Sequence, residues 1–129
     1  KALFIGIDEE TYAVPISNII ETVRLYPEDI TFVDGNRTTV IRNEVLPVLG
    51  LRNLVKKTDT TDSTKSMYGV IIQREDKKFG LLVDRLIGEQ EITIKNVGGS
   101  MKRTKGIAGV TITGDGRVIL VLDVNTLVK

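Results

Sequence analysis

Three residue types with distinctive chemistry are missing from this chain of 129 residues: it has no cysteine, no histidine and no tryptophan. Without cysteine there can be no disulfide framework, thiolate nucleophile or zinc–thiolate site. Without histidine the chain lacks the most frequent general base and the commonest transition-metal ligand. We therefore expect none of these catalytic or metal sites, and the lack of cysteine is compatible with a reduced cytoplasmic location.

Strong net charge and long hydrophobic runs are missing as well. Eighteen basic and 17 acidic residues leave a net charge of +1, which provides no electrostatic footprint for nucleic acid or an anionic membrane. No segment approaches the roughly 20 apolar residues of a membrane-spanning helix, and the start, KALFIGIDEE, breaks too soon for a signal peptide. Hydrophobic residues make up 41% of the chain, enough for a packed core. We expect a single globular domain that neither binds nucleic acid nor inserts into a membrane.

An internal repeat is the most informative feature that is present. Residues 43–56 (NEVLPVLGLRNLVK) align with residues 116–129 (GRVILVLDVNTLVK) at an offset of 73. Upstream, residues 3–21 align with residues 70–88 at an offset of 67. Because the two matches are collinear, they predict two halves of similar structure.

Each half shows several short apolar runs separated by turn signals, which predicts about ten strands and very little helix. Asp34-Gly35 and Gly114-Asp115-Gly116 are typical of tight hairpin turns. The closing runs, EVLPVLGL and RVILVLDV, are almost continuously apolar, which favours strands covered on both faces. Small barrels are the expected architecture, because closing a sheet removes its edges.

A polar segment separates the halves. Residues 56–66 (KKTDTTDSTKS) contain no apolar side chain and indicate a solvated linker. We place the first half at approximately 1–57, the linker at 58–66 and the second half at 67–129, within one domain that spans residues 1–129. This division allows for strand exchange between the halves.

The candidate chemical motifs favour structural roles. Asp8–Glu10 lie at a hairpin tip without the spacing of a calcium loop, and the GDG turn at 114–116 does not begin a phosphate-binding motif. Asp84 or Asp123 is expected to form a buried ion pair, of structural importance, with Arg85 or Arg117. No nucleophile is accompanied by a base, so we expect a non-catalytic binding module without cofactor or metal.

Four segments resemble the CheW-like domain of bacterial chemotaxis proteins: YAVPISNIIETV, IRNEVLPVLGLRNLV, KKFGLLVDRLIGEQEITIK and GIAGVTITGDGRVILVLDVNTLV. The resemblance extends over residues 2–128, and FGLLVDRLIGEQEITIK and GDGRVILVLDV are its most specific parts. It implies an all-β fold of two intertwined five-stranded SH3-like barrels that share a core, with very little helix.

The family has two main branches, the stand-alone coupling protein CheW and the C-terminal regulatory domain of the histidine kinase CheA. Two segments are similar to the kinase branch, TTVIRNEVLPVLGL and the ending DGRVILVLDV. A first residue other than Met favours the same branch. Arg42 matches the arginine of the family pattern, whereas Asn43 replaces its usual glycine. Asn tolerates positive φ better than most residues, so the turn is expected to persist.

The resemblance implies a regulatory or adaptor domain of CheA that binds the CheW coupling protein and the cytoplasmic tips of chemoreceptors. Such a domain relays receptor state to the rest of the CheA kinase, in the cytoplasm at membrane-bound receptor arrays. Its two similar barrels would provide two similar docking faces. The alternatives are a stand-alone CheW-type coupling protein or CheW–receiver hybrid, and an SH3-like ligand- or nucleic-acid-binding barrel, which the few aromatic residues disfavour.

The end of the first repeat is a candidate docking region. Leu54 and Val55 follow a closing strand and precede the polar linker, which predicts a position at the rim of the barrel. Leu49 is expected to join them, with Leu3, in an exposed apolar patch that a partner would cover. In the alternative interpretation, these side chains complete the core of the first barrel. With the two residues from the family pattern, the candidate partner-binding residues are Leu3, Arg42, Asn43, Leu49, Leu54 and Val55.

Overall fold

The computed structural model describes residues 1–56, 67–96 and 106–127. The linker predicted at 58–66 lies outside the described residues. Within them the chain forms eleven strands, two short α-helices and two 3₁₀ turns. The elements are β1 (Ala2–Ile7), β2 (Glu10–Pro15), η1 (Ile16–Asn18), β3 (Ile19–Leu25), η2 (Pro27–Asp29), β4 (Thr31–Val33), β5 (Asn36–Ile41), β6 (Glu44–Gly50), α1 (Leu51–Lys56), β7 (Met67–Arg74), β8 (Lys77–Val83), β9 (Arg85–Gln90), β10 (Ile107–Ile112), β11 (Val118–Leu122) and α2 (Val124–Leu127).

The strands form two sheets in two compact units. Unit 1, Lys1–Ser17 with Leu86–Lys129, holds a five-stranded sheet in the order β10-β11-β2-β1-β9. Unit 2, Asn18–Arg85, holds a six-stranded sheet in the order β3-β7-β8-β6-β5-β4. The expectation of an all-β fold with little helix is confirmed. The second sheet has six strands where we expected five, because the first half of the chain adds the short strand β4 before β5.

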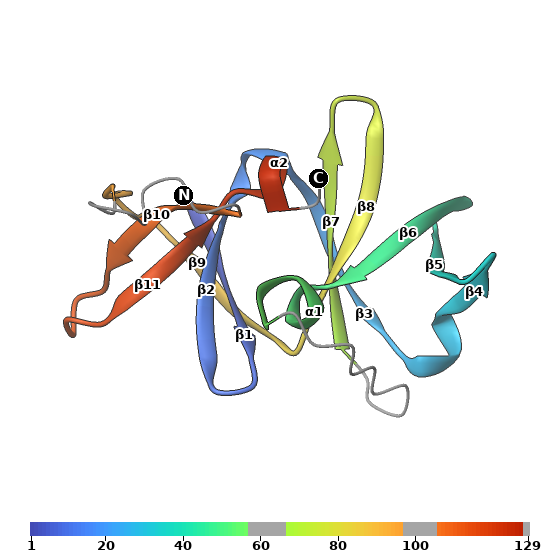
Figure 1. The fold of residues 1–129 in the computed structure, drawn as a ribbon, viewed down its shortest axis with the longest axis horizontal. Coiled ribbons are helices and arrows are strands. Elements are labelled where there is room, and N and C mark those ends of the chain that lie inside the picture. The colour runs from blue at the N-terminus through green and yellow to red at the C-terminus, as the bar shows by residue number, and fades with distance from the viewer. Residues whose placement is uncertain (57–66, 97–105, 128–129) are drawn as a thin grey trace. The chain divides into compact units, whose positions relative to one another are not determined.

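Each sheet combines a hairpin from one half of the sequence with strands from the other half. The β1–β2 hairpin joins β9, β10 and β11, while the β7–β8 hairpin joins β3 to β6. In Figure 1 the blue β1–β2 hairpin accordingly lies beside the orange β11. The compact units therefore do not coincide with the sequence halves 1–57 and 67–129. Backbone pairing depends on which strand edges meet in space, and nearness along the chain does not decide it.

Two short parallel ladders complete the exchange and occupy equivalent positions. Val121 of β11 pairs with Ala13 of β2, and Val48 of β6 pairs with Gly80 of β8. The sequence offset of 73 carries Val48 onto Val121, and the offset of 67 carries Ala13 onto Gly80. Both matches found in the sequence therefore correspond to a true structural repeat.

The sheet of unit 1 closes on itself. Beyond β9, Lys95 and Val110 of the edge strand β10 exchange two backbone hydrogen bonds, with N···O distances of 2.7 and 2.9 Å. Gly109 permits this close approach, because a Cβ at that position would lie 2.5 Å from the carbonyl oxygen of Lys95. The predicted small barrel is thus visible in unit 1 as a sheet whose two edges meet.

Each unit has its own hydrophobic cluster, built from the inward side chains of its strands. In unit 1 the buried members are Ala2, Phe4, Ala13, Ile119 and Val121, and in unit 2 they are Leu25, Val48 and Leu82. Among the described residues, the buried polar side chains are Thr39 and Thr111. Thr39 pairs with Leu46 and Thr111 with Ile119, so the two threonines hold the same place in the repeat. The hydroxyl of Thr39 donates to the carbonyl of Asp29 at 2.9 Å, which removes the cost of burying it.

None of the helices in the described part of the chain is long and apolar enough to cross a membrane.

We predict that Gly109→Ala destabilises the chain by about 1–3 kcal/mol, because the added methyl group collides with the backbone of Lys95. Gly114→Ala is the matched control, since a Cβ there meets nothing within 4 Å. Urea unfolding followed by circular dichroism measures both changes. Equal stability of the two variants would contradict the tight contact at Lys95.

We also predict that Leu122→Ala costs about 2–5 kcal/mol, because this side chain of β11 is fully buried. Leu120 lies on the same strand but is only partly buried, so Leu120→Ala should cost less. The same unfolding assay tests the pair. A loss below about 1 kcal/mol at Leu122 would show that β11 is not a core strand.

Candidate functional site

An apolar groove lies at the end of the unit 2 sheet. It has a volume of about 630 Å³ and is bordered by the β4–β5 hairpin, β6 and the beginning of α1. Its walls include Phe32 and Val33 of β4, Pro47 and Leu49 of β6, and Leu54 of α1. Phe32 and Val33 are exposed, so the groove presents apolar surface to solvent.

Local sequence explains why these side chains gather. Asp34 and Gly35 both adopt positive φ, 53° and 81°, the combination that favours a two-residue hairpin turn and folds β4 onto β5. Along β6, Leu46 and Val48 face the core. Alternation along a strand turns Val45 and Pro47 to the opposite face, where both are exposed.

The equivalent region of unit 1 has no such open groove around its helix, so the two units differ at this place. The offset of 73 carries Leu54 of α1 onto Leu127 of α2. Leu127 is buried and packs tightly against Gly106, where a Cβ would lie 2.7 Å from its Cδ1 atom. Leu54 is only half-buried and lines the open groove. The same leucine therefore completes a core in one unit and borders an open surface in the other.

The structure brings together only some of the predicted partner-binding residues. Leu49 and Leu54 both line the groove, whereas Val55 is half-buried and is not part of its lining. Leu3 is only 8% exposed, so the expectation that it joins an exposed patch is wrong. It lies in β1, an inner strand of its sheet whose six residues are all buried.

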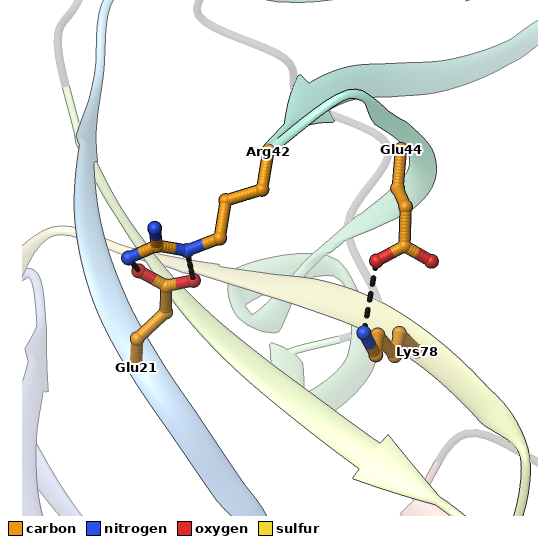
Figure 2. A network of polar contacts seen from close by, with 4 residues as sticks. All are labelled: Glu21, Arg42, Glu44 and Lys78. Atoms are coloured by element: carbon orange, nitrogen blue, oxygen red, sulfur yellow. Dashed lines mark hydrogen bonds and ion pairs between the residues drawn. The ribbon is translucent and has the colours of Figure 1, made fainter.

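Arg42 and Asn43 form the turn between β5 and β6, outside the groove lining. Both have positive φ, 51° and 69°, so Asn43 keeps the turn as expected. The guanidinium of Arg42 donates two hydrogen bonds to the carboxylate of Glu21 in β3, at 3.0 and 3.2 Å. On β6, Glu44 accepts a hydrogen bond from Lys78 of β8 at 2.8 Å. Figure 2 shows the two ion pairs on either side of the turn.

The Arg42–Glu21 ion pair also stabilises the ionised forms of both side chains. Hydrogen bonding to Arg42 lowers the pKa of the Glu21 carboxyl below its ordinary value, and the pKa of Arg42 is raised in return. Because the folded state holds the Glu21 proton less tightly than the unfolded state, this pair favours folding at neutral pH. The contribution is lost as the pH falls through the lowered pKa.

Asp84 forms its ion pair with Arg52 of α1, at 3.0 Å. The sequence analysis named Arg85 and Arg117 as possible partners. It did not name Arg52, which lies 32 residues away in the chain. The carboxylate of Asp84 is almost buried and Arg52 is partly exposed. The pair therefore anchors α1, one wall of the groove, to the end of β8.

Sequence reasoning missed several exposed apolar residues. The closing strands were expected to be covered on both faces, yet Val45 and Val118 are 64% and 63% exposed. Phe32 and Val33 of β4 were not singled out either. The alternation of side chains along a strand could have predicted the exposure of Val45. If Leu46 faces the core, its neighbour Val45 must face away from it.

The groove is suited to contact with another protein. Its lining combines aliphatic and aromatic side chains with few ionisable ones, Asp34 and Arg37. Across the described ranges, no three acidic, histidine or cysteine side chains are arranged to hold a metal ion. An exposed apolar depression with a polar rim is typical of a protein interface.

Comparison with known proteins gives consistent results. The family model for the CheW-like domain matches residues 1–129. The sensor histidine kinase CheAY of Helicobacter pylori is 42% identical over 127 residues, which cover 98% of this chain and 16% of the kinase. The chemotaxis protein CheA of Bacillus subtilis is 35% identical over 128 residues, 99% of this chain and 19% of that protein. The chain thus spans less than a fifth of either relative.

Among solved structures, the scaffolding protein TtCheW of Thermoanaerobacter tengcongensis has the same fold, with a TM-score of 0.73. The similarity covers 99% of this chain and 86% of TtCheW at 20% identity. Because the family model covers the whole sequence, the chain belongs to the CheW-like domain family of chemotaxis signalling proteins.

Proposed function

We propose that this chain is the regulatory domain of a CheA-type histidine kinase and that it docks the CheW coupling protein. CheW-like domains are non-catalytic coupling modules. The kinase assignment is supported by identities of 42% and 35% to the two kinase-type relatives, in which the matching region is a small part of a much longer chain.

The observation that carries the docking proposal is the open groove around Leu54. In unit 1 the equivalent Leu127 is buried, whereas Leu54 and Leu49 border apolar surface that stays open in the described part of the chain. Covering such surface is favourable because it removes apolar area from water. We assign Leu49 and Leu54 to the contact and place Val55, Arg42 and Asn43 at its periphery.

The same proposal includes the wider signalling context. A domain of this type would also contact the cytoplasmic tips of chemoreceptors and the rest of the CheA kinase, in the cytoplasm at membrane-bound arrays. A stand-alone CheW-type coupling protein is the second candidate. It is favoured by the match to TtCheW, of which this chain covers 86%.

We predict that Leu54→Lys weakens binding to the CheW protein of the same organism by at least about tenfold. The charged side chain would have to be desolvated when the groove is covered. The melting temperature should change by only a few degrees, because Leu54 is half-exposed. Isothermal titration calorimetry and thermal denaturation measure the two quantities.

Two further variants serve as controls for Leu54→Lys. Leu127→Lys, at the buried equivalent position, should unfold unit 1, and Ile87→Lys, at an exposed residue of β9, should leave both quantities unchanged. Normal CheW binding by a folded Leu54→Lys variant would reject the groove as the docking site. Unfolding of that variant would instead support the interpretation of Leu54 as core.

A further inference from the structure

The buried threonines Thr39 and Thr111 hold the same place in the two units, but within the described residues only Thr39 has a side-chain hydrogen bond. Each is 3% exposed. The hydroxyl of Thr39 donates to the carbonyl oxygen of Asp29, the last residue of η2, at 2.9 Å. For the hydroxyl of Thr111, the described part of the chain offers no acceptor. A buried hydroxyl without a partner is costly to the fold, so folding stability does not explain this side chain.

The two units correspond on both sides of η2. The offset of 67 carries Leu25 onto Ile92. Leu25 belongs to the hydrophobic cluster of unit 2, and Ile92 packs against the cluster of unit 1. Farther along the chain, the residue before the buried threonine pairs with Thr31 in unit 2 and with Lys95 in unit 1. These two correspondences frame the same connection in both units.

This connection is longer in unit 2 than in unit 1. In unit 2 it comprises residues 26–30 and contains η2, whose Asp29 accepts the hydrogen bond of Thr39. In unit 1 it comprises only residues 93–94, which form no helical turn. Unit 1 therefore lacks the segment that provides the acceptor in unit 2.

A pocket with a volume of about 550 Å³ lies beside Thr111 in unit 1. Its lining is formed by Phe4, residues 90–93, Lys95 and residues 111–114, and we call it the seam pocket. Its volume lies within the range of roughly 300–1,000 Å³ that is typical of ligand sites. Where η2 contacts the buried threonine of unit 2, unit 1 thus has an open pocket.

The seam pocket combines three kinds of recognition group. Thr111 supplies a hydroxyl donor, and the ring of Phe4 supplies an apolar wall. The backbone of Val110 bonds to the opposite edge of the sheet, and Ile112, two residues farther along β10, directs its N–H and C=O to the same side. In the described chain, no backbone hydrogen bond joins Ile112 to residues 91–94. A peptide, with its own amide groups and an aliphatic side chain, matches this set.

We propose that the seam pocket binds a short turn peptide of a partner protein, which supplies from outside the contact that η2 supplies within unit 2. A carbonyl oxygen of the peptide accepts the hydrogen bond of Thr111, and an aliphatic side chain packs against Phe4. The ionisable lining residues are Glu91 and Lys95, whose charges cancel, so hydrogen bonds and shape select the peptide. The inference goes beyond the proposed docking of CheW and does not depend on it.

The repeat indicates which peptide sequence fits. In unit 2 the connection reads YPEDI (residues 26–30), and Ile30 packs against the hydrophobic cluster. The amide of Asp29 donates to the carbonyl of Tyr26 at 2.8 Å, and the Asp29 carboxylate accepts from the amide of Tyr26 at 2.9 Å. Pro27 fixes a backbone angle at the start of the turn. Because these constraints lie within the segment, a free peptide of this sequence loses less conformational entropy on binding than an unconstrained one.

The peptide YPEDIT with blocked ends tests the proposal, since it reproduces residues 26–31 of unit 2. Titrated into the 129-residue chain and followed by two-dimensional NMR, it should bind with a dissociation constant on the order of 1 mM. The amide signals of Thr111 and Ile112 should shift most. Replacement of the peptide's aspartate by alanine removes the local cap and should weaken binding at least about threefold. No binding at about 10 mM peptide, or largest shifts outside the seam pocket, would overturn the inference.

Two matched substitutions separate peptide binding from folding. Thr111→Val replaces an unpaired hydroxyl by a methyl group, so the melting temperature should stay or rise, while peptide binding weakens at least about fivefold. Thr39→Val removes the hydrogen bond to Asp29, so the melting temperature should fall by several degrees, while peptide binding is unchanged. A Thr111→Val variant that loses stability as Thr39→Val does, or that binds the peptide as the original chain does, would contradict the proposal. No CheW protein is present in these measurements, so their failure leaves the proposed function untouched.

Discussion

The parallel contacts between β2 and β11 and between β6 and β8 join strands that lie far apart in the chain. Val121 is paired with Ala13, and Val48 with Gly80. Through these ladders each hairpin becomes part of a sheet that belongs mainly to the other half of the sequence. Neither half contains a complete sheet by itself, so the chain must form long-range pairs before either hydrophobic cluster is covered. Such non-local pairing is entropically costly and is compensated only when the whole sheet is in place.

The repeat preserves this scaffold while its surfaces have diverged. Thr39 and Thr111 are buried at the same position, and each closing strand is followed by a short helix. At the helix, however, Leu127 is buried against Gly106, and Leu54 borders a groove. Residues that face the interior are constrained by packing in both units, whereas outward residues are free to differ. The candidate docking groove of this domain therefore lies where the two repeats of the sequence differ.

Electrostatics plays a local role in this nearly neutral chain. Arg42 has a left-handed conformation that is unfavourable for a residue with a side chain, and its two hydrogen bonds to Glu21 tie the turn to β3. The Arg52–Asp84 pair similarly ties α1 to the end of β8. These contacts hold in place the hairpin and the helix that flank the proposed docking surface. Apolar residues such as Leu49 and Leu54 then supply the surface that a partner covers.

The sequence alone determined the repeat, the all-β class, the turns at Asp34-Gly35 and Asn43, and the proximity of Leu49 to Leu54. These features are local, because turn chemistry and strand alternation are encoded over a few neighbouring residues. Only the tertiary structure decided which hairpins exchange between the sheets, that Leu3 is buried, and that Asp84 pairs with Arg52. Such outcomes depend on which strand edges and which charges meet after folding, and residues tens of positions apart carry no mutual signal in a single sequence.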